Sequence, residues 1–196
     1  MAEKRQYSGK SNQDKVSTEF GKVPPQVTEF EEAVLGALML EKDAVHTVVD
    51  ILKPECFYSD AHNKIFKAIL ALSLDHKPID IHTVSQKLKV EGDIDIVGGP
   101  FYLAQLTNKV ASTAHLEYHS RIIAQKYIQR ELIRVGADIQ TRAFQESDDV
   151  ADMLDQAEQD LFQIAEGNIK KEVSRIDAVL RQAIEQIQEA GKRPDG

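Results

Sequence analysis

Hydrophobic residues recur at helical spacing through the second half of the chain. Between residues 112 and 145 an apolar stripe advances by four, three and four residues, and residues 149–166 carry a second stripe of similar spacing. The first stripe is Ile128, Leu132, Val135 and Ile139, and the second is Val150, Leu154, Ala157, Leu161 and Ile164. The polar residues between them can end one helix and cap the next. The pattern predicts an antiparallel helical hairpin over 112–166, with the stripes as its seam.

The first helix of this hairpin is too long for the second to cover. At about 1.5 Å per residue the two helices would measure about 50 Å and 27 Å. Leu116, Ile123 and Tyr127 must therefore pack on the residues that precede the hairpin.

A further apolar line on the first helix lies opposite the seam at 100° per residue. It consists of Ile133, Ala137 and Phe144. If the hairpin projects from the rest of the chain, this line is uncovered, and it is then a candidate self-association face. The alternative is a helix that breaks near Gly136, with all helices packed into one bundle.

Residues 23–111 show shorter apolar periods separated by turn residues, which predict five helices in a small orthogonal head. Thr28 and Glu31 have the spacing of a capping box at the first helix. Further N-caps are expected at Asp43, before a helix over 44–53, and at Ser59 and Asp80. Gly36 inside the first helix costs about 1 kcal/mol relative to alanine, so we expect close helix packing there.

The two ends of the chain differ from this core. Residues 1–22 are polar without an apolar period and are predicted to form a disordered tail. Residues 167–173 resemble a tether, and 174–190 form an amphipathic segment whose docking face is Ile176, Leu180, Ala183 and Ile187. Residues 191–196 read as the start of a connection to a further domain. The predicted fold is therefore all-α, with a head, a projecting hairpin and a separate C-terminal linker helix.

Composition narrows the class of protein. The 196 residues carry a formal net charge of −8, which argues against a dedicated surface for a nucleic-acid backbone. Cys56 is the single cysteine, so disulfide frameworks and thiolate zinc sites are excluded. No apolar run approaches the ~20 residues that a membrane span needs, and no signal peptide begins the chain. We expect a cytoplasmic protein that does not enter a membrane.

Candidate chemistry is sparse. Gly9-Lys10-Ser11 resembles the end of a phosphate-binding loop, but Lys4 stands where that motif needs glycine. His115 and His119 have the spacing of metal ligands on one helix face, without a third ligand. His62 fits a structural histidine at a core edge better than a general base. We therefore expect no catalytic, cofactor-binding or metal site, and an interaction module rather than an enzyme.

Several motifs in order resemble the N-terminal region of the bacterial replicative DNA helicase family DnaB. They are Val23-Pro24-Pro25, the run Glu29 to Leu40, Phe57-Tyr58, His62, Ile65-Phe66, Pro78-Ile79-Asp80, Val97-Gly98-Gly99, Tyr102-Leu103, Ser112-Thr113-Ala114, Tyr118 and Arg130-Glu131-Leu132-Ile133. The resemblance covers about 23–190. Phe30 stands where the family usually has alanine, and Ala111 where it often has proline; neither change affects the expected fold.

The resemblance implies a role that the residues alone do not give. Such regions form the collar of a hexameric ring, paired through their hairpins as a trimer of dimers, and they bind primase. The linker helix would dock on the motor domain of the neighbouring subunit. ATP, magnesium and most DNA contacts would belong to a motor domain that this chain does not include. The alternatives are an unrelated helical adaptor or regulator that self-associates through its hairpin, and a small metal enzyme using His115 and His119.

Overall fold

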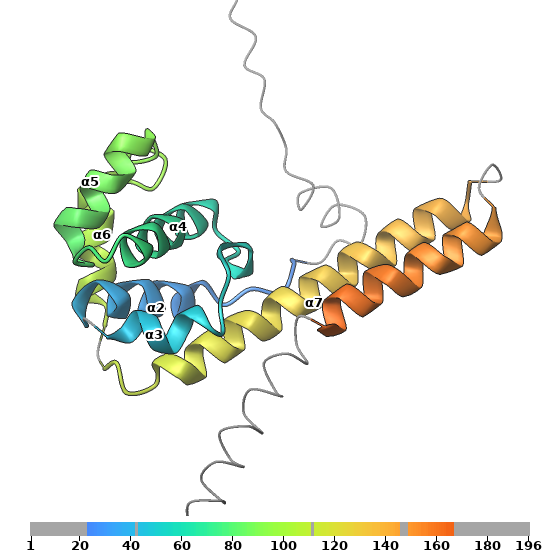
Figure 1. Cartoon of the computed structure of the whole chain (residues 1–196), viewed down its shortest axis with the longest axis horizontal. Coiled ribbons are helices and arrows are strands. Elements are labelled where there is room, and N and C mark those ends of the chain that lie inside the picture. Colours follow the sequence, from blue (N-terminus) through green and yellow to red (C-terminus); the bar gives the residue numbers. More distant parts are fainter. Residues whose placement is uncertain (1–22, 42, 111, 146–148, 167–196) are drawn as a thin grey trace, which may run out of the picture. The chain divides into compact units, whose positions relative to one another are not determined.

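The computed structural model describes residues 23–41, 43–110, 112–145 and 149–166, and within these ranges every regular element is a helix (Figure 1). The predicted all-α fold is confirmed for this part of the chain. The predictions for 1–22, 167–173, 174–190 and 191–196 lie outside the described residues. The chain divides into two compact units, one ending at Asp138 and the other beginning at Ile139.

The first unit contains the helices of the predicted head in the expected order. They are α2 (Thr28–Leu40), α3 (Ala44–Val49), the 3-10 helix η1 (Pro54–Cys56), α4 (Asp60–Leu74), α5 (Ile81–Glu91) and α6 (Gly99–Asn108). Helix α3 ends four residues before the predicted residue 53. The backbone N–H groups of Ile51 and Leu52 both bond back to the carbonyl of Val48, so the chain turns there and enters η1 at Pro54.

Helix α2 lies at the centre of the head and packs against α3, α4 and α6 (Figure 1). Its apolar residues Val34, Leu35 and Leu38 are completely buried. Gly36 faces α6, and a Cβ added there would meet the carbonyl oxygen of Leu106 and lie 2.6 Å from Cγ2 of Val110. The close packing expected at this glycine is confirmed.

The helix starts follow the sequence prediction only in part. Asp80 caps α5, because its carboxylate accepts from the backbone N–H groups of His82 at 2.8 Å and Thr83 at 2.9 Å. Asp43 and Ser59 occupy the N-cap positions of α3 and α4 but make no capping hydrogen bond. The predicted capping box at Thr28 is wrong: α2 begins at Thr28 itself, and Glu31 turns into the core.

Helix α7 runs from Leu116 to Ala143 without a break at Gly136, so the alternative of a broken helix is wrong. Its first half presents one face to the head. Leu116 and Ile123 belong to the hydrophobic core of the head and Tyr127 packs against it, as the sequence predicted. Ser120 and Arg130 are buried on the same face. A second helical segment covers residues 150–166.

None of the helices within the described ranges combines the length and apolar character that crossing a membrane requires.

Candidate functional site

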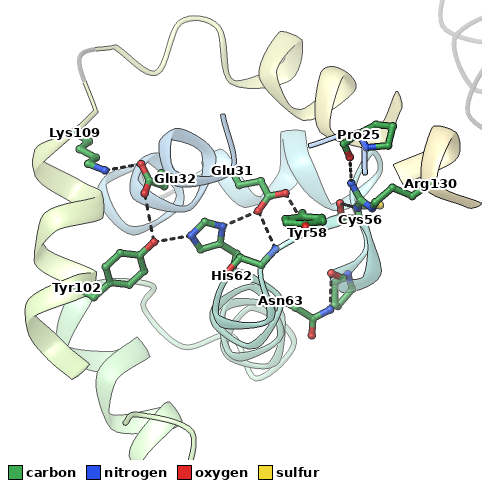
Figure 2. A network of polar contacts seen from close by, with 12 residues as sticks. Pro25, Glu31, Glu32, Cys56, Tyr58, His62, Asn63, Tyr102, Lys109 and Arg130 are labelled. Atoms are coloured by element: carbon green, nitrogen blue, oxygen red, sulfur yellow. Dashed lines mark hydrogen bonds and ion pairs between the residues drawn. The ribbon is translucent and has the colours of Figure 1, made fainter. Parts of the chain in front are cut away.

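A network of polar side chains crosses the interior of the head, and Glu31 of α2 lies at its centre (Figure 2). Glu31 is 1% exposed. Its carboxylate accepts from the backbone N–H of Tyr58 at 2.7 Å, from that of Ser59 at 3.5 Å and from Nδ1 of His62 at 2.7 Å. A buried charge is tolerated when donors surround it, as they do here. Glu31 therefore ties α2 to the start of α4.

His62 carries the network from α2 to α6. It is 2% exposed, and both ring nitrogens have partners: Nδ1 reaches Glu31, and Nε2 lies 2.7 Å from the hydroxyl of Tyr102. An ionised carboxylate only accepts, so the His62 ring donates to Glu31 from Nδ1. His62 is the structural histidine that the sequence predicted, although it lies deeper than a core edge.

The network reaches the surface at Glu32 and Lys109. The Tyr102 hydroxyl lies 3.5 Å from one oxygen of Glu32, whose other oxygen forms a 2.6 Å ion pair with Lys109. Burial, followed by the charge of Glu32, raises the pKa of Tyr102 to about 12. Tyr102 therefore remains a neutral donor at physiological pH and links the buried end of the network to its exposed end.

Arg130 of α7 lies beside this network (Figure 2). Its Nη1 donates to the carbonyl of Pro25 at 2.9 Å and its Nη2 to the carbonyl of Cys56 at 2.6 Å. The guanidinium carbon lies 5.7 Å from the ring centre of Tyr58 and 5.8 Å from that of Tyr127. Burial lowers the pKa of Arg130 from its usual value. Arg130 thus fastens α7 to two segments of the head.

His115 and His119, the candidate metal pair, have a different environment. The ring of His119 stacks on Phe30 with centroids 4.7 Å apart and planes inclined by 7°. Burial, and then the nearby His115, lower the pKa of His119. Across the described ranges no group of three or more His, Cys, Asp or Glu side chains could hold a metal ion. The geometry supports packing between α2 and α7, with Phe30 filling the position where alanine was expected.

The residues predicted for the hairpin seam differ in exposure. Of the first stripe, Val135 is buried, Ile128 and Ile139 are half-buried, and Leu132 is exposed. Of the second stripe, Ala157 and Ile164 are half-buried, whereas Val150, Leu154 and Leu161 are exposed. The pairing of the two stripes stays a prediction.

The residues of the candidate self-association face are accessible to different degrees. Ile133 is 40% exposed and Phe144, which follows the end of α7, is 82% exposed. Ala137 is half-buried. Whether this line mediates association stays a prediction. The predicted docking face of 174–190 lies outside the described residues.

Sequence patterns did not identify Glu31 and Arg130 as parts of one network. Their partners are 27 to 31 residues away for Glu31 and 74 to 105 residues away for Arg130. One signal was present for Arg130: it follows Leu116 and Ile123 at intervals of seven residues, on the face that enters the core.

Known proteins of one family match this chain. The model of the DnaB-like helicase N terminal domain matches residues 23–125, which is more than half of the chain. The replicative DNA helicase DnaB of Rhodothermus marinus is 36% identical over 176 residues, covering 90% of this chain and 19% of that protein. The replicative DNA helicase DnaC of Bacillus subtilis is 34% identical over 172 residues, covering 88% of this chain and 38% of that protein.

Solved structures share the fold. The N-terminal domain of DnaB helicase from Mycobacterium tuberculosis superimposes with a TM-score of 0.69 at 34% identity, over 72% of this chain and 99% of that one. A DnaB-like replicative helicase, described together with its interactions with primase, gives a TM-score of 0.60 at 22% identity over 72% of this chain and 31% of that chain.

Proposed function

Because the chain belongs to the family of DnaB-like helicase N-terminal domains, we propose that it forms part of the collar of a hexameric replicative DNA helicase. In this role it pairs with copies of itself and supports ring assembly. The observation that carries the proposal is the match of both sequence and fold to the N-terminal domain from Mycobacterium tuberculosis. Because the chain belongs to this family, it is not an unrelated helical adaptor.

The activity of the whole helicase is part of the proposal. The chain spans 19% and 38% of the length of the two relatives described above. Unwinding of duplex DNA, and the ATP and magnesium it uses, are assigned to a motor domain outside the matched region. The same holds for most DNA contacts. On this assignment the present chain is not itself an enzyme and works in the cytoplasm, where DNA is replicated.

Two partners besides the chain itself are proposed. Primase is one, and the support is that a helicase of the same fold has been described with its interactions with primase. The motor domain of a neighbouring subunit is the other, and it would receive the predicted docking face on 174–190. The described residues do not assign a primase contact to any side chain.

Self-association is tested at Ile133 of α7. An aspartate at this partly exposed position places a carboxylate in any apolar interface that forms there, at a cost of several kcal/mol. Sedimentation velocity of Ile133→Asp should show weaker association than the unchanged chain, with the same helical circular dichroism. Leu74→Asp is the matched control, because Leu74 of α4 is 81% exposed and belongs to no predicted interface.

An unchanged sedimentation profile for Ile133→Asp would contradict a role for this position in pairing. Loss of helicity in the same variant would identify Ile133 as a core residue instead. Primase binding is tested by calorimetric titration of the chain with the C-terminal domain of primase from the same species. Absence of heat and of co-sedimentation would contradict that part of the proposal.

A further inference from the structure

The face of α7 that enters the head ends on a charged residue. Leu116, Ser120, Ile123, Tyr127 and Arg130 follow one another at intervals of four, three, four and three residues, and so lie along one side of the helix. Arg130 is only 6% exposed. A guanidinium in such a place loses hydration, and the loss must be offset by specific contacts.

The contacts of Arg130 are unusual for a buried cation. Across the described residues no carboxylate lies within ion-pair distance of it, and its Nε has no hydrogen-bond partner. Its two terminal nitrogens instead donate to backbone carbonyls, of Pro25 before α2 and of Cys56 at the end of η1. Had stability of the core alone been the requirement, an apolar side chain of similar volume would serve at least as well.

The geometry of these contacts constrains the helix. A guanidinium is planar, and its donors point in fixed directions. Two donors aimed at two carbonyls from separate segments, with the aromatic rings of Tyr58 and Tyr127 nearby, fix both the rotation and the tilt of α7 at this point. A lysine could place its amine against one carbonyl at a time but has no rigid fork with which to hold both.

Two residues of the candidate self-association face follow Arg130 on α7. Ile133 and Ala137 follow Arg130 by three and seven residues, so they lie on the side of α7 next to it. Before Arg130 the face that enters the head is buried, whereas Ile133 is 40% exposed. Arg130 therefore stands where α7 passes from the core of the head to the surface.

We propose that Arg130 is a positioning residue that fixes the direction in which α7 leaves the head and thereby sets how Ile133 and Ala137 are presented to a second copy of the chain. The second half of this statement rests on the proposed function, whereas the first half does not. Arg130 itself need not touch the partner.

The direction of α7 is measured as a distance between two spin labels, one on each side of Arg130. Cysteines replace Lys67 on α4 and Asp138 on α7, both of which are exposed. Cys56 is 3% exposed, so it should remain unlabelled, which labelling of the otherwise unchanged chain verifies. Labelled chain is diluted in unlabelled chain, so that double electron–electron resonance reports distances within one copy.

Arg130→Met keeps the apolar stem and removes both donors. Its distance distribution should be broader than that of the unchanged chain, and Arg130→Lys should be intermediate. Arg134→Met is the matched control, one turn further along α7, because Arg134 is exposed and its ion pair among the described residues is with Glu131. This control should reproduce the original distribution.

An unchanged distribution in Arg130→Met overturns the proposal. If Arg130→Met does not fold, Arg130→Lys decides: broadening with unchanged helical circular dichroism supports positioning, and an unchanged distribution or an unfolded chain overturns it. In sedimentation, Arg130→Lys should raise the dissociation constant of self-association about tenfold. If the unchanged chain is monomeric at every concentration, the pairing function fails, while the distance measurement still decides the role of Arg130.

Discussion

The Glu31 carboxylate is accommodated inside the head because three donors converge on it. Two are backbone N–H groups, of Tyr58 and Ser59, and the third is the His62 ring. Each of these groups is left without an acceptor when the carboxylate is removed. A buried donor without a partner costs about 1–3 kcal/mol, which is more than an average hydrogen bond contributes.

Replacement of Glu31 by alanine should therefore lower the free energy of unfolding by about 3 kcal/mol or more. Glu117→Ala is the matched control: its ion pair with Arg121 lies on the surface of α7, and such a pair contributes about 1 kcal/mol or less. Urea unfolding followed by circular dichroism measures both. Equal losses for the two variants would show that the buried network adds nothing beyond a surface ion pair.

Tyr102 makes the head sensitive to alkali. Burial and the charge of Glu32 raise its pKa to about 12, above the ordinary value of 10.0. Between these values the unfolded chain loses the proton while the folded chain keeps it, so unfolding is increasingly favoured as the pH rises from about 10 to 12. In Tyr102→Phe this dependence should be weaker, and the tyrosinate absorbance titration should lose its component near pH 12. Persistence of that component would assign it to another tyrosine.

At the scale of elements, the crossing of α2 and α6 depends on the missing side chain of Gly36. A Cβ there would collide with the backbone of Leu106, which cannot move without shifting α6. Overpacking of this kind typically costs about 1–3 kcal/mol. Gly36→Ala should therefore destabilise the head, even though alanine is the better helix former.

Gly136 of α7 supplies the comparison for Gly36. A Cβ added to Gly136 meets nothing within 4 Å. The effect of Gly136→Ala should therefore come from helix propensity alone, and the substitution should stabilise α7 by about 1 kcal/mol. Thermal unfolding should shift upward for Gly136→Ala and downward for Gly36→Ala. A downward shift for both would mean that Gly136 packs against a surface outside the described residues.

The elements show what the sequence could predict. Helix positions follow apolar periodicity, and Asp80 caps α5 because a capping carboxylate needs only N–H groups two or three residues away. Thr28 and Glu31 also have the spacing of a capping box, but the Glu31 carboxylate accepts from donors 27 to 31 residues further along the chain. Local patterns carry no information about such partners. For the same reason Arg130 was recognised only as part of a family motif.

At the scale of the whole molecule, the hydrophobic core belongs to the first unit. Every side chain of the core cluster lies between Val34 and Ile123. Among the described residues only Val135 is an apolar side chain buried outside that cluster. In the second unit Val150, Leu154, Leu161 and Phe162 are exposed. Stability of the folded chain should therefore depend almost entirely on residues up to Asp138.

A chain that ends at Asp138 should accordingly retain one cooperative thermal transition. Even complete exposure of Val135 would remove only about 1.5–3 kcal/mol, and the remaining core is untouched. A chain that ends at residue 115 lacks α7, and with it Leu116 and Ile123 of the core and both hydrogen bonds of Arg130. Its transition should be much lower or lost. Calorimetry of the two truncated chains beside the complete one measures the difference, and loss of the transition in the longer truncated chain would show that residues after 138 complete the core of the head.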